Sequence, residues 1–289
     1  MDRETVMSDL YKIYHYPEIL DDFWYFIEER FRITQKKKAG LPWPWTDDEI
    51  LRKAYINNLD RKDDKGTQYL LDLVKSNPKI STVYLVMLYR FSGSNSALLD
   101  ILVKHDVSEW SEMMKDAVIF NSEAYQRPCF PQGKGSGRHF ITEVLHLVSD
   151  EVESMLKKNK YSSMKELVEE ICEIYPKYAF QGKPHNRYKF HTNECVKDFT
   201  YFFSFLDKNS KCEIGPGAVK GLKVMFTSGT LEQRIEMLKK NLLFSSLNLN
   251  DEILENCLCE FRKYLEFKQG KPIKRQYSTD PASKGYVKN

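Results

Sequence analysis

The chain has 289 residues, of which 42% are hydrophobic and 29% are charged, and its formal net charge is +3. This composition is typical of a soluble globular protein with one large or two small domains. No apolar run reaches the roughly 18 residues of a membrane span. The N-terminus shows no signal-peptide pattern, so we predict a cytoplasmic protein. The small net charge does not by itself indicate a nucleic-acid partner.

The cysteines show no metal-ligand spacing. None of the six forms a C-x-x-C pair: they are Cys129, Cys172, Cys195, Cys212, Cys257 and Cys259. A cytosolic protein keeps such thiols reduced, and a zinc or iron–sulfur site would need paired ligands. The sequence therefore predicts neither a metal nor a cofactor.

Helical periodicity dominates the chain, and strand signals are scarce. We expect helices at residues 4–35, 69–76, 95–105, 108–120, 140–158, 163–174 and, as two closing helices capped near Thr230 and Asn250, within 230–267. Residues 79–91 are apolar nearly all round, which favours a buried helix. The prediction is a mostly α fold, a single helical globular domain over residues 1–270 that could form two lobes. An extended or disordered basic tail follows at 271–289.

Residues 36–67 combine more distinctive features than any other stretch. They begin with three lysines, a turn at Gly40 and two prolines. Thr46 and Glu49 match the T-x-x-E capping box, which predicts a helix from Thr46 with Ala54 on its apolar face. Polar side chains then follow that face, namely Asn58, Arg61, Asp63 and Asp64. A solvated loop explains this succession of amide, guanidinium and carboxylates poorly.

Three other segments are candidate sites. Residues 121–138 form a loop that contains GKGSG, but the Walker A spacing between strand and helix is absent. We expect it to contact DNA, to act as a lid, or to be inert. Asp198 follows a polar, aromatic segment and precedes several aromatic residues. Its carboxylate could have a raised pKa, be held ionised by a basic partner, or lie on a helix surface.

The third segment is the Gly215-Pro216-Gly217 turn, which opens a helix. The free N–H groups of a helix N-terminus bind anions, and Lys220 and Lys223 follow one turn on, so a DNA phosphate is one possible ligand. A packing turn between two helices is the alternative. The turn is loosely similar to the hairpin of helix-hairpin-helix DNA glycosylases, in which the catalytic aspartate lies downstream, whereas Asp198 lies upstream.

Motifs spread over most of the chain indicate a family resemblance. They are Gly40, Pro44-Trp45-Thr46-Asp47-Asp48, Ile50-Leu51, Asn58, Arg61, Asp63-Asp64, Thr67, Ala124-Tyr125-Gln126, Asp198, Gly215-Pro216-Gly217-Ala218, Gly221-Leu222, Glu260, Lys263 and Tyr264. In these motifs the chain resembles the helical family of α-glutamyl/putrescinyl-thymine pyrophosphorylases and 5-hydroxymethyl-deoxyuridine DNA kinases, which are associated with hypermodified phage DNA. The family has Phe-Cys where this chain has Ile56-Asn57, and Arg-Glu where it has Arg61-Lys62.

The resemblance implies action on modified bases in double-stranded DNA, and base excision is the reaction we expect first. A DNA glycosylase needs a scaffold that grips phosphates, a pocket for a flipped base and a carboxylate. It would remove a hydroxymethylated or glucosylated pyrimidine from phage DNA as an antiviral defence. The catalytic candidates are Asp198, Asp64, Asp63 and Asn58. The candidates for binding DNA or the flipped base are Lys36, Lys37, Trp43, Trp45, Arg61, Tyr125, Gln126, Gly215, Gly217, Lys220 and Lys263.

Two alternatives stay open. A kinase or pyrophosphorylase acting on 5-hydroxymethylpyrimidines in DNA would need ATP or pyrophosphate with Mg²⁺, for which Asp63 and Asp64 are possible ligands. The absence of a P-loop or kinase signature counts against it. A non-catalytic reader of modified DNA would tolerate the replacement of any single aspartate.

Overall fold

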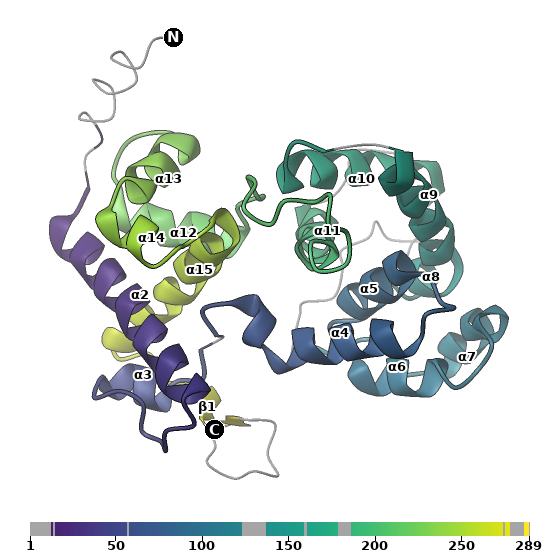
Figure 1. The fold of residues 1–289 in the computed structure, drawn as a ribbon, viewed down its shortest axis with the longest axis horizontal. Helices are drawn as coiled ribbons and strands as arrows, with labels where there is room; N and C mark the ends of the chain where they lie inside the picture. Colours follow the sequence, from purple (N-terminus) through teal and green to yellow (C-terminus); the bar gives the residue numbers. More distant parts are fainter. Residues whose placement is uncertain are drawn as a thin grey trace. The chain divides into compact units, whose positions relative to one another are not determined.

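The computed structural model describes residues 13, 15–56, 58–122, 137–158, 161–178, 186–273, 275–277 and 286–288. The chain divides into two compact units, Met1–Asp63 with Ile214–Asn289 (unit 1) and Asp64–Glu213 (unit 2). Helices form nearly all of the regular structure in both units, which confirms the mostly α prediction (Figure 1). No helix in the described ranges is long and apolar enough to cross a membrane.

Unit 1 takes its helices from both ends of the chain. The first segment supplies α2 (Pro17–Lys38), α3 (Glu49–Lys53) and the 3-10 helix η1 (Arg61–Asp63), and the second supplies α12 (Pro216–Met225), α13 (Leu231–Lys239), α14 (Leu242–Ser246) and α15 (Asp251–Lys268). The two segments meet where α2 packs against α12 and α15. The short helix α14 was not expected between the two closing helices.

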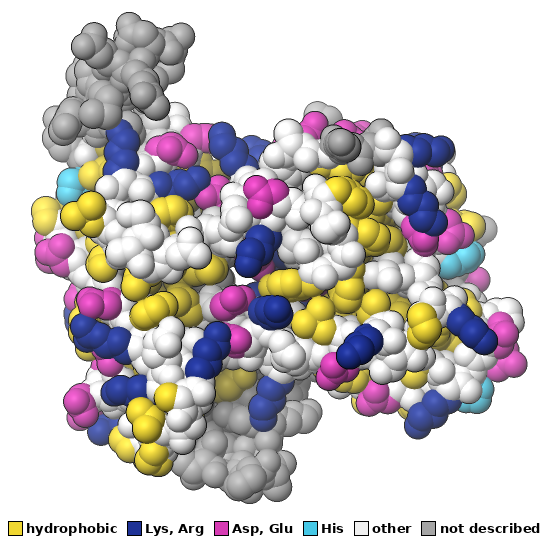
Figure 2. Space-filling model, in the orientation of Figure 1, with side chains coloured by type: hydrophobic (Ala, Val, Ile, Leu, Met, Phe, Trp, Pro, Cys, Tyr) yellow, Lys and Arg dark blue, Asp and Glu magenta, His cyan; other side chains and the backbone are white. Residues whose placement is uncertain are grey.

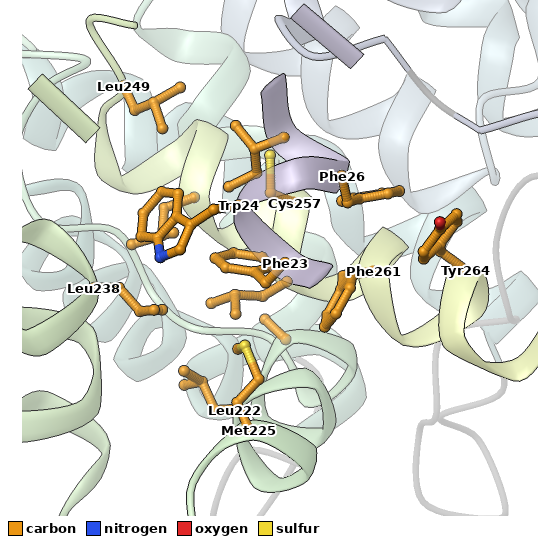
Figure 3. Close-up of a cluster of buried hydrophobic side chains, with 14 of the residues drawn as sticks. Phe23, Trp24, Phe26, Leu222, Met225, Leu238, Leu249, Cys257, Phe261 and Tyr264 are labelled. Carbon is orange, nitrogen blue, oxygen red and sulfur yellow. The ribbon is translucent and has the colours of Figure 1, made fainter. Parts of the chain in front are cut away.

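An aromatic core joins α2 to α15 (Figure 3). Phe23 and Phe26 are fully buried on the same face of α2, because residues three apart are neighbours on a helix. Phe23 packs against Phe261 with ring centroids 5.1 Å apart, and Phe26 lies 5.1 Å from the Tyr264 ring. Such aromatic pairs each contribute roughly 0.5–1.5 kcal/mol beyond their buried area. The core therefore fastens α2 to a helix near the far end of the sequence.

Two glycines allow α12 to cross α15 at close range. A Cβ atom on Gly221 would lie 2.3 Å from the carbonyl oxygen of Leu258, and one on Gly217 would lie 2.4 Å from Sγ of Cys259. Neither distance is tolerable for a Cβ atom, so both positions require glycine. These contacts match the packing turn that the sequence left open as the alternative to a phosphate site.

The helix predicted from Thr46 begins three residues later. Asp48 caps α3, because its Oδ1 atom accepts hydrogen bonds from the N–H groups of Ile50 at 2.9 Å and Leu51 at 2.8 Å. The Thr46 hydroxyl instead donates to the buried carboxylate of Glu29 at 2.6 Å. The capping-box prediction is wrong because Asp48 already satisfies the first free N–H groups of the helix.

The same helix is also shorter than predicted. It ends at Lys53, and Ala54 is extended and forms an isolated antiparallel bridge with Gln276 in the tail. Asn58 therefore lies in the segment after the helix and not on it. The tail contains two short strands, β1 (Arg275–Tyr277) and β2 (Tyr286–Lys288), which pair antiparallel with each other.

The predicted caps of the two closing helices are confirmed. The Thr230 hydroxyl accepts from the Gln233 N–H at 3.2 Å, and the Gln233 side chain accepts from the Thr230 N–H at 2.8 Å, which is a complete capping box. Asn250 caps α15 by accepting from the Ile253 N–H at 2.9 Å.

Unit 2 is a continuous stretch of helices. They are α4 (Lys65–Ser76), α5 (Thr82–Phe91), α6 (Ser96–Leu102), the 3-10 helix η2 (Val107–Glu109), α7 (Trp110–Asp116), α8 (Gly137–His139), the π-helix η3 (Phe140–Val144), α9 (Leu145–Lys158), α10 (Met164–Tyr178) and α11 (Asn186–Phe199). Every residue of α5 from Val83 to Phe91 is buried, and α5 packs against α9 and α11. The buried helix predicted at 79–91 is confirmed.

Aromatic rings fill the space between α5, η3, α10 and α11. Phe91 lies 5.1 Å from Phe140 and 5.3 Å from the His191 ring, which stacks on it. Tyr175 contacts Phe140 at 5.7 Å and Tyr188 at 5.2 Å. Unit 2 thus has a core of its own, and α11 supplies part of it.

Candidate functional site

The three lysines of the richest stretch lie in the last turn of α2. The helix ends in a Schellman motif, since the Gly40 N–H donates to the Lys37 carbonyl at 3.0 Å and the Leu41 N–H donates to the Lys36 carbonyl at 3.0 Å. Gly40 has a φ of +69°, the left-handed conformation that this motif requires and glycine adopts without strain. The predicted turn at Gly40 is confirmed, and it sends the chain away from the helix axis.

Trp45 closes the loop that follows. Its indole N–H donates to the Leu41 carbonyl at 2.8 Å, and the Lys36 ammonium donates to the Trp45 carbonyl at 2.7 Å. The Lys37 ammonium lies 4.9 Å from the centre of the Trp45 ring, within cation–π range. Trp43 is 44% exposed, so only one of the two predicted tryptophans is bound into these contacts.

Asn58 contacts a basic residue that precedes α3 in the sequence and an acidic residue that follows it. The Lys37 ammonium is 3.5 Å from its Oδ1 atom, and its Nδ2 atom donates to the Asp63 carbonyl at 2.9 Å. The Asp63 carboxylate forms an ion pair with Lys38 at 2.8 Å. These contacts bring together three of the predicted site residues, Lys37, Asn58 and Asp63.

Sequence reasoning missed Arg30, which contacts the backbone of Asn58. Its buried guanidinium donates to the Asn58 carbonyl at 3.0 Å, to Oδ1 of Asn256 at 3.0 Å and to Sγ of Cys257 at 3.3 Å. It thereby fixes the backbone at Asn58 against α15. A charged residue on the apolar face of α2, next in line after Phe26 and Ile27, was the signal that could have found it. We call Arg30, Lys37, Lys38, Asn58 and Asp63 the Asn58 cluster.

A small open pocket borders the Asn58 cluster. Polar side chains on one side and apolar ones on the other line it: Arg30, Thr34, Lys37 and Asn58, with Ile33, Leu51, Ile56 and Leu59. Its interior has room for about one water molecule. A nucleobase would enter only if lining side chains moved. The pocket therefore offers a positively charged contact point and not a preformed base-binding cavity.

Several predicted site residues of unit 1 are engaged with acidic neighbours. Arg61 lies 4.0 Å from Glu252 of α15, and Lys263 pairs with Glu260 at 2.6 Å. The Gly215 N–H donates to the buried Glu255 carboxylate at 3.2 Å. A carboxylate therefore already lies at the N-terminus of α12, and the Gly215 N–H is engaged within the fold. Gly217 faces Cys259, as described above.

The lysines that the structure describes in unit 1 are spread over several helices. Lys220 is exposed on α12. On the face shown in Figure 2, basic and acidic side chains alternate over the molecule. Lys36–Lys38 is a local concentration of basic residues in the last turn of α2, and two of these lysines belong to the Asn58 cluster.

Asp198 has a different environment, in unit 2. Its carboxylate accepts two hydrogen bonds from the guanidinium of Arg90, at 2.5 Å from Nε and 2.9 Å from Nη2, and it has no exposed surface. Of the alternatives left open for Asp198, the structure shows a carboxylate with a basic partner. A catalytic carboxylate must touch its substrate, and this one is enclosed. The geometry therefore argues against the predicted direct role.

A second buried ion pair lies one turn away on α11. Lys197 and Glu194 are both buried and 3.1 Å apart. Sequence reasoning identified neither this pair nor Arg90. A charge near the end of the apolar run that follows Lys79 was the signal for Arg90, because a buried guanidinium needs an anionic partner.

Three predicted site residues remain, namely Asp64, Tyr125 and Gln126. Asp64 occupies the N-cap position of α4, without a side-chain hydrogen bond to the helix N–H groups. Tyr125 and Gln126 lie outside the described residues, as do residues 133–136 of the GKGSG segment.

A family model described as 5-hmdU DNA kinase, helical domain, matches residues 17–272. The chain belongs to this family. The match includes helices of both units and every candidate site residue, and it confirms the resemblance seen in the sequence motifs. A comparison with curated proteins and one with solved structures found no match.

The family description raises the question of a magnesium–nucleotide site, because kinases use Mg²⁺ with ATP. Within the described ranges, no three His, Cys, Asp or Glu side chains lie close enough together to hold a metal ion. Asp63, one of the two possible ligands, is paired with Lys38. Neither Asp63 nor Asp64 is therefore assigned to a magnesium site.

Proposed function

We propose that this chain acts on 5-hydroxymethylpyrimidines in DNA as a kinase or related group-transfer enzyme, with the Asn58 cluster at the modified nucleotide. The observation that carries this proposal is the family match over residues 17–272. Its description names a DNA kinase and a hydroxymethylated base, and it favours the group-transfer alternative over base excision.

The Asn58 cluster supports the location. A nucleotide in DNA presents a phosphate on one side and base-edge donors and acceptors on the other. Lys37 and the exposed Lys36 lie where a phosphate would be held, and the amide of Asn58 is the side-chain type that reads a base edge in two directions. Arg30 and Asp63 hold that amide in place through the Asn58 backbone and Nδ2 atom.

Base excision is the second candidate. Asp64 and Asp63 are the carboxylates left for it, because Asp198 is enclosed by Arg90. A glycosylase acting on a hydroxymethylated or glucosylated pyrimidine would use the same phosphate and base contacts at the Asn58 cluster. Antiviral defence would be the biological setting of this second candidate.

One experiment separates the two reactions. Duplexes that carry thymine, 5-hydroxymethyluracil, 5-hydroxymethylcytosine or its glucosylated form are incubated with the full chain, with and without ATP and Mg²⁺, and the products are weighed by mass spectrometry. We expect a gain of one phosphate on the hydroxymethylated duplexes only when ATP is present. A free base and an abasic site without ATP would establish base excision instead.

Two variants connect the reaction to the site. Asn58→Ala should lower product formation by roughly tenfold to a hundredfold, since a base-edge contact contributes about 1–3 kcal/mol of discrimination. Lys115→Gln, an exposed lysine of α7 in unit 2, is the matched control and should leave the rate unchanged. Equal rates for Asn58→Ala and wild type would remove the Asn58 cluster from the proposal. Binding of modified DNA without any mass change would favour a non-catalytic reader.

A further inference from the structure

The loop between α2 and α3 exposes two large apolar side chains at its tip. Leu41 is 50% exposed and Trp43 is 44% exposed, and every residue from Lys38 to Pro44 is exposed. Hydrophobic side chains gather over this loop in Figure 2. Exposed apolar side chains that share one loop tip form a candidate contact surface for a partner.

The tip is held in a defined shape. The Schellman motif fixes its first residues, Pro42 and Pro44 restrict φ, and the Trp45 indole N–H bonds to the Leu41 carbonyl. Lys36 ties the other side of the loop through the Trp45 carbonyl. Because the loop is already ordered, its insertion into a partner would cost little conformational entropy.

Two exposed lysines directly precede the tip in the sequence. Lys36 and Lys38 are exposed, and the Lys38 side chain retains 56% of its exposure while it pairs with Asp63. A rigid apolar point between positive charges complements nucleic acid, whose stacked bases lie between two rows of phosphates.

We propose that Leu41 and Trp43 form a wedge that inserts into the base stack of duplex DNA beside the modified nucleotide. This inference rests on the proposed action on modified DNA. Apolar side chains that enter a base step unstack it and kink the duplex, and one or two of them suffice. A stable protein interface needs about 800 Å² from each partner, far more than two side chains supply. DNA is therefore the partner that fits the tip.

The wedge has a direct optical test. A duplex carries 5-hydroxymethyluracil with 2-aminopurine as the adjacent base, because 2-aminopurine fluoresces more strongly when it is unstacked. Wild-type protein should raise the fluorescence severalfold. Leu41→Ala/Trp43→Ala should lose most of that rise and bind the duplex about tenfold more weakly, as expected for the loss of an aromatic contact to a base.

Three controls accompany the double variant. Trp43→Phe should keep most of the rise, because it retains an aromatic ring. Leu242→Ala removes another exposed leucine of unit 1, 84% exposed on α14, and should behave as wild type. A duplex with an abasic position opposite the target is already open. It should reduce the affinity difference between wild type and the double variant to about twofold, since less stacking is left to break.

The outcomes separate the wedge from the proposed function. A double variant that keeps its thermal unfolding temperature and gives the full fluorescence rise overturns the wedge, as does wild-type protein that binds without any rise. Wild-type protein that raises the fluorescence but leaves every base chemically unchanged supports the wedge and contradicts the proposed reaction. Phosphate gain by a double variant at the wild-type rate, with full fluorescence, contradicts the wedge alone.

Discussion

The Asn58 cluster of unit 1 and the ion pairs of α11 in unit 2 use the same types of side chain with opposite results. In unit 1, Lys37, Asn58 and Asp63 are half-buried, and Lys37 and Asn58 line a pocket that is open to solvent. In unit 2, Asp198 is enclosed by a bidentate contact with Arg90. A charged residue among apolar residues therefore indicates a functional site only when its partner and its exposure are known.

The two regions also differ in what their charges do for stability. Removing two ions from water costs several kcal/mol each, and a buried pair recovers this cost only through good geometry. The Arg90–Asp198 pair meets that condition with two hydrogen bonds. The Lys38–Asp63 pair, whose side chains are 56% and 28% exposed, contributes little because water screens it. Loss of stability should therefore follow mutation in unit 2, and loss of function should follow mutation in unit 1.

The largest expected effect is at the buried pair. Asp198→Asn leaves the Arg90 guanidinium buried without its counter-charge, and we expect a loss of about 3–5 kcal/mol in the free energy of unfolding, measured by urea denaturation. Arg90→Met/Asp198→Leu, which removes both charges, should recover much of this loss. If Asp198→Asn were fully stable but inactive, Asp198 would be a catalytic residue and the comparison would fail.

The next effect concerns pH. Burial raises the pKa of the Cys257 thiol from 9.0 to about 11. The folded protein holds this proton more tightly, so the contribution to stability is complete below pH 9.0 and disappears as the pH rises through about 11. The loss amounts to roughly 2–3 kcal/mol. Thermal unfolding of wild type and Cys257→Ala between pH 8 and 11 measures it, and parallel curves for the two proteins would contradict the assignment.

The crossing of α12 and α15 gives a third test. Gly217→Ala brings a Cβ atom against Sγ of Cys259 and should destabilise the fold by about 1–3 kcal/mol. Adding Cys259→Ala removes that atom and should restore most of the lost stability. DNA affinity measured on the restored double variant decides between packing and phosphate contact. Normal affinity supports packing, and weak affinity in a stable protein would return Gly217 to the DNA interface.

The smallest effect is expected at Lys37. Lys37→Gln should weaken binding to modified and unmodified duplexes alike and reduce the slope of log affinity against log salt by about 1, because one phosphate contact is lost. The free energy of unfolding should change little, since the Lys37 side chain is only half-buried. Titrations at several salt concentrations measure the slope. A selective loss of binding to the hydroxymethylated duplex would instead place Lys37 at the base.

The sequence predicted the helices well and their contacts less well. Periodicity found α2, α5 and α15, because their apolar faces are long and repeat regularly. It misplaced the start of α3, because Thr46 and Asp48 are both acceptable caps, and only the buried Glu29 carboxylate decides which one is used. Competing local signals of this kind are settled by tertiary contacts.

In the candidate site, too, the residues that are close in sequence were predicted and their distant partners were not. Lys37, Asn58 and Asp63 were recognisable as polar residues close together in sequence, and they meet in the structure. Arg30 joins them from the middle of α2, and Asn256 and Cys257 come from more than 220 positions away. No local sequence pattern identifies partners that lie so far apart in the chain. Asp198 was correctly judged unusual, but the partner that explains it, Arg90, is likewise distant in sequence.

The split construction of unit 1 has a consequence for the newly made chain. While the ribosome adds residues one by one, α2 emerges early, but α12 and α15, which cover its apolar face, belong to the segment Ile214–Asn289. Unit 2 is continuous and can finish folding first. At about 5–20 residues per second, the last segment needs roughly 4–15 seconds more. During that interval Phe23 and Phe26 lack their packing partners on α15, and the apolar face of α2 is open to water.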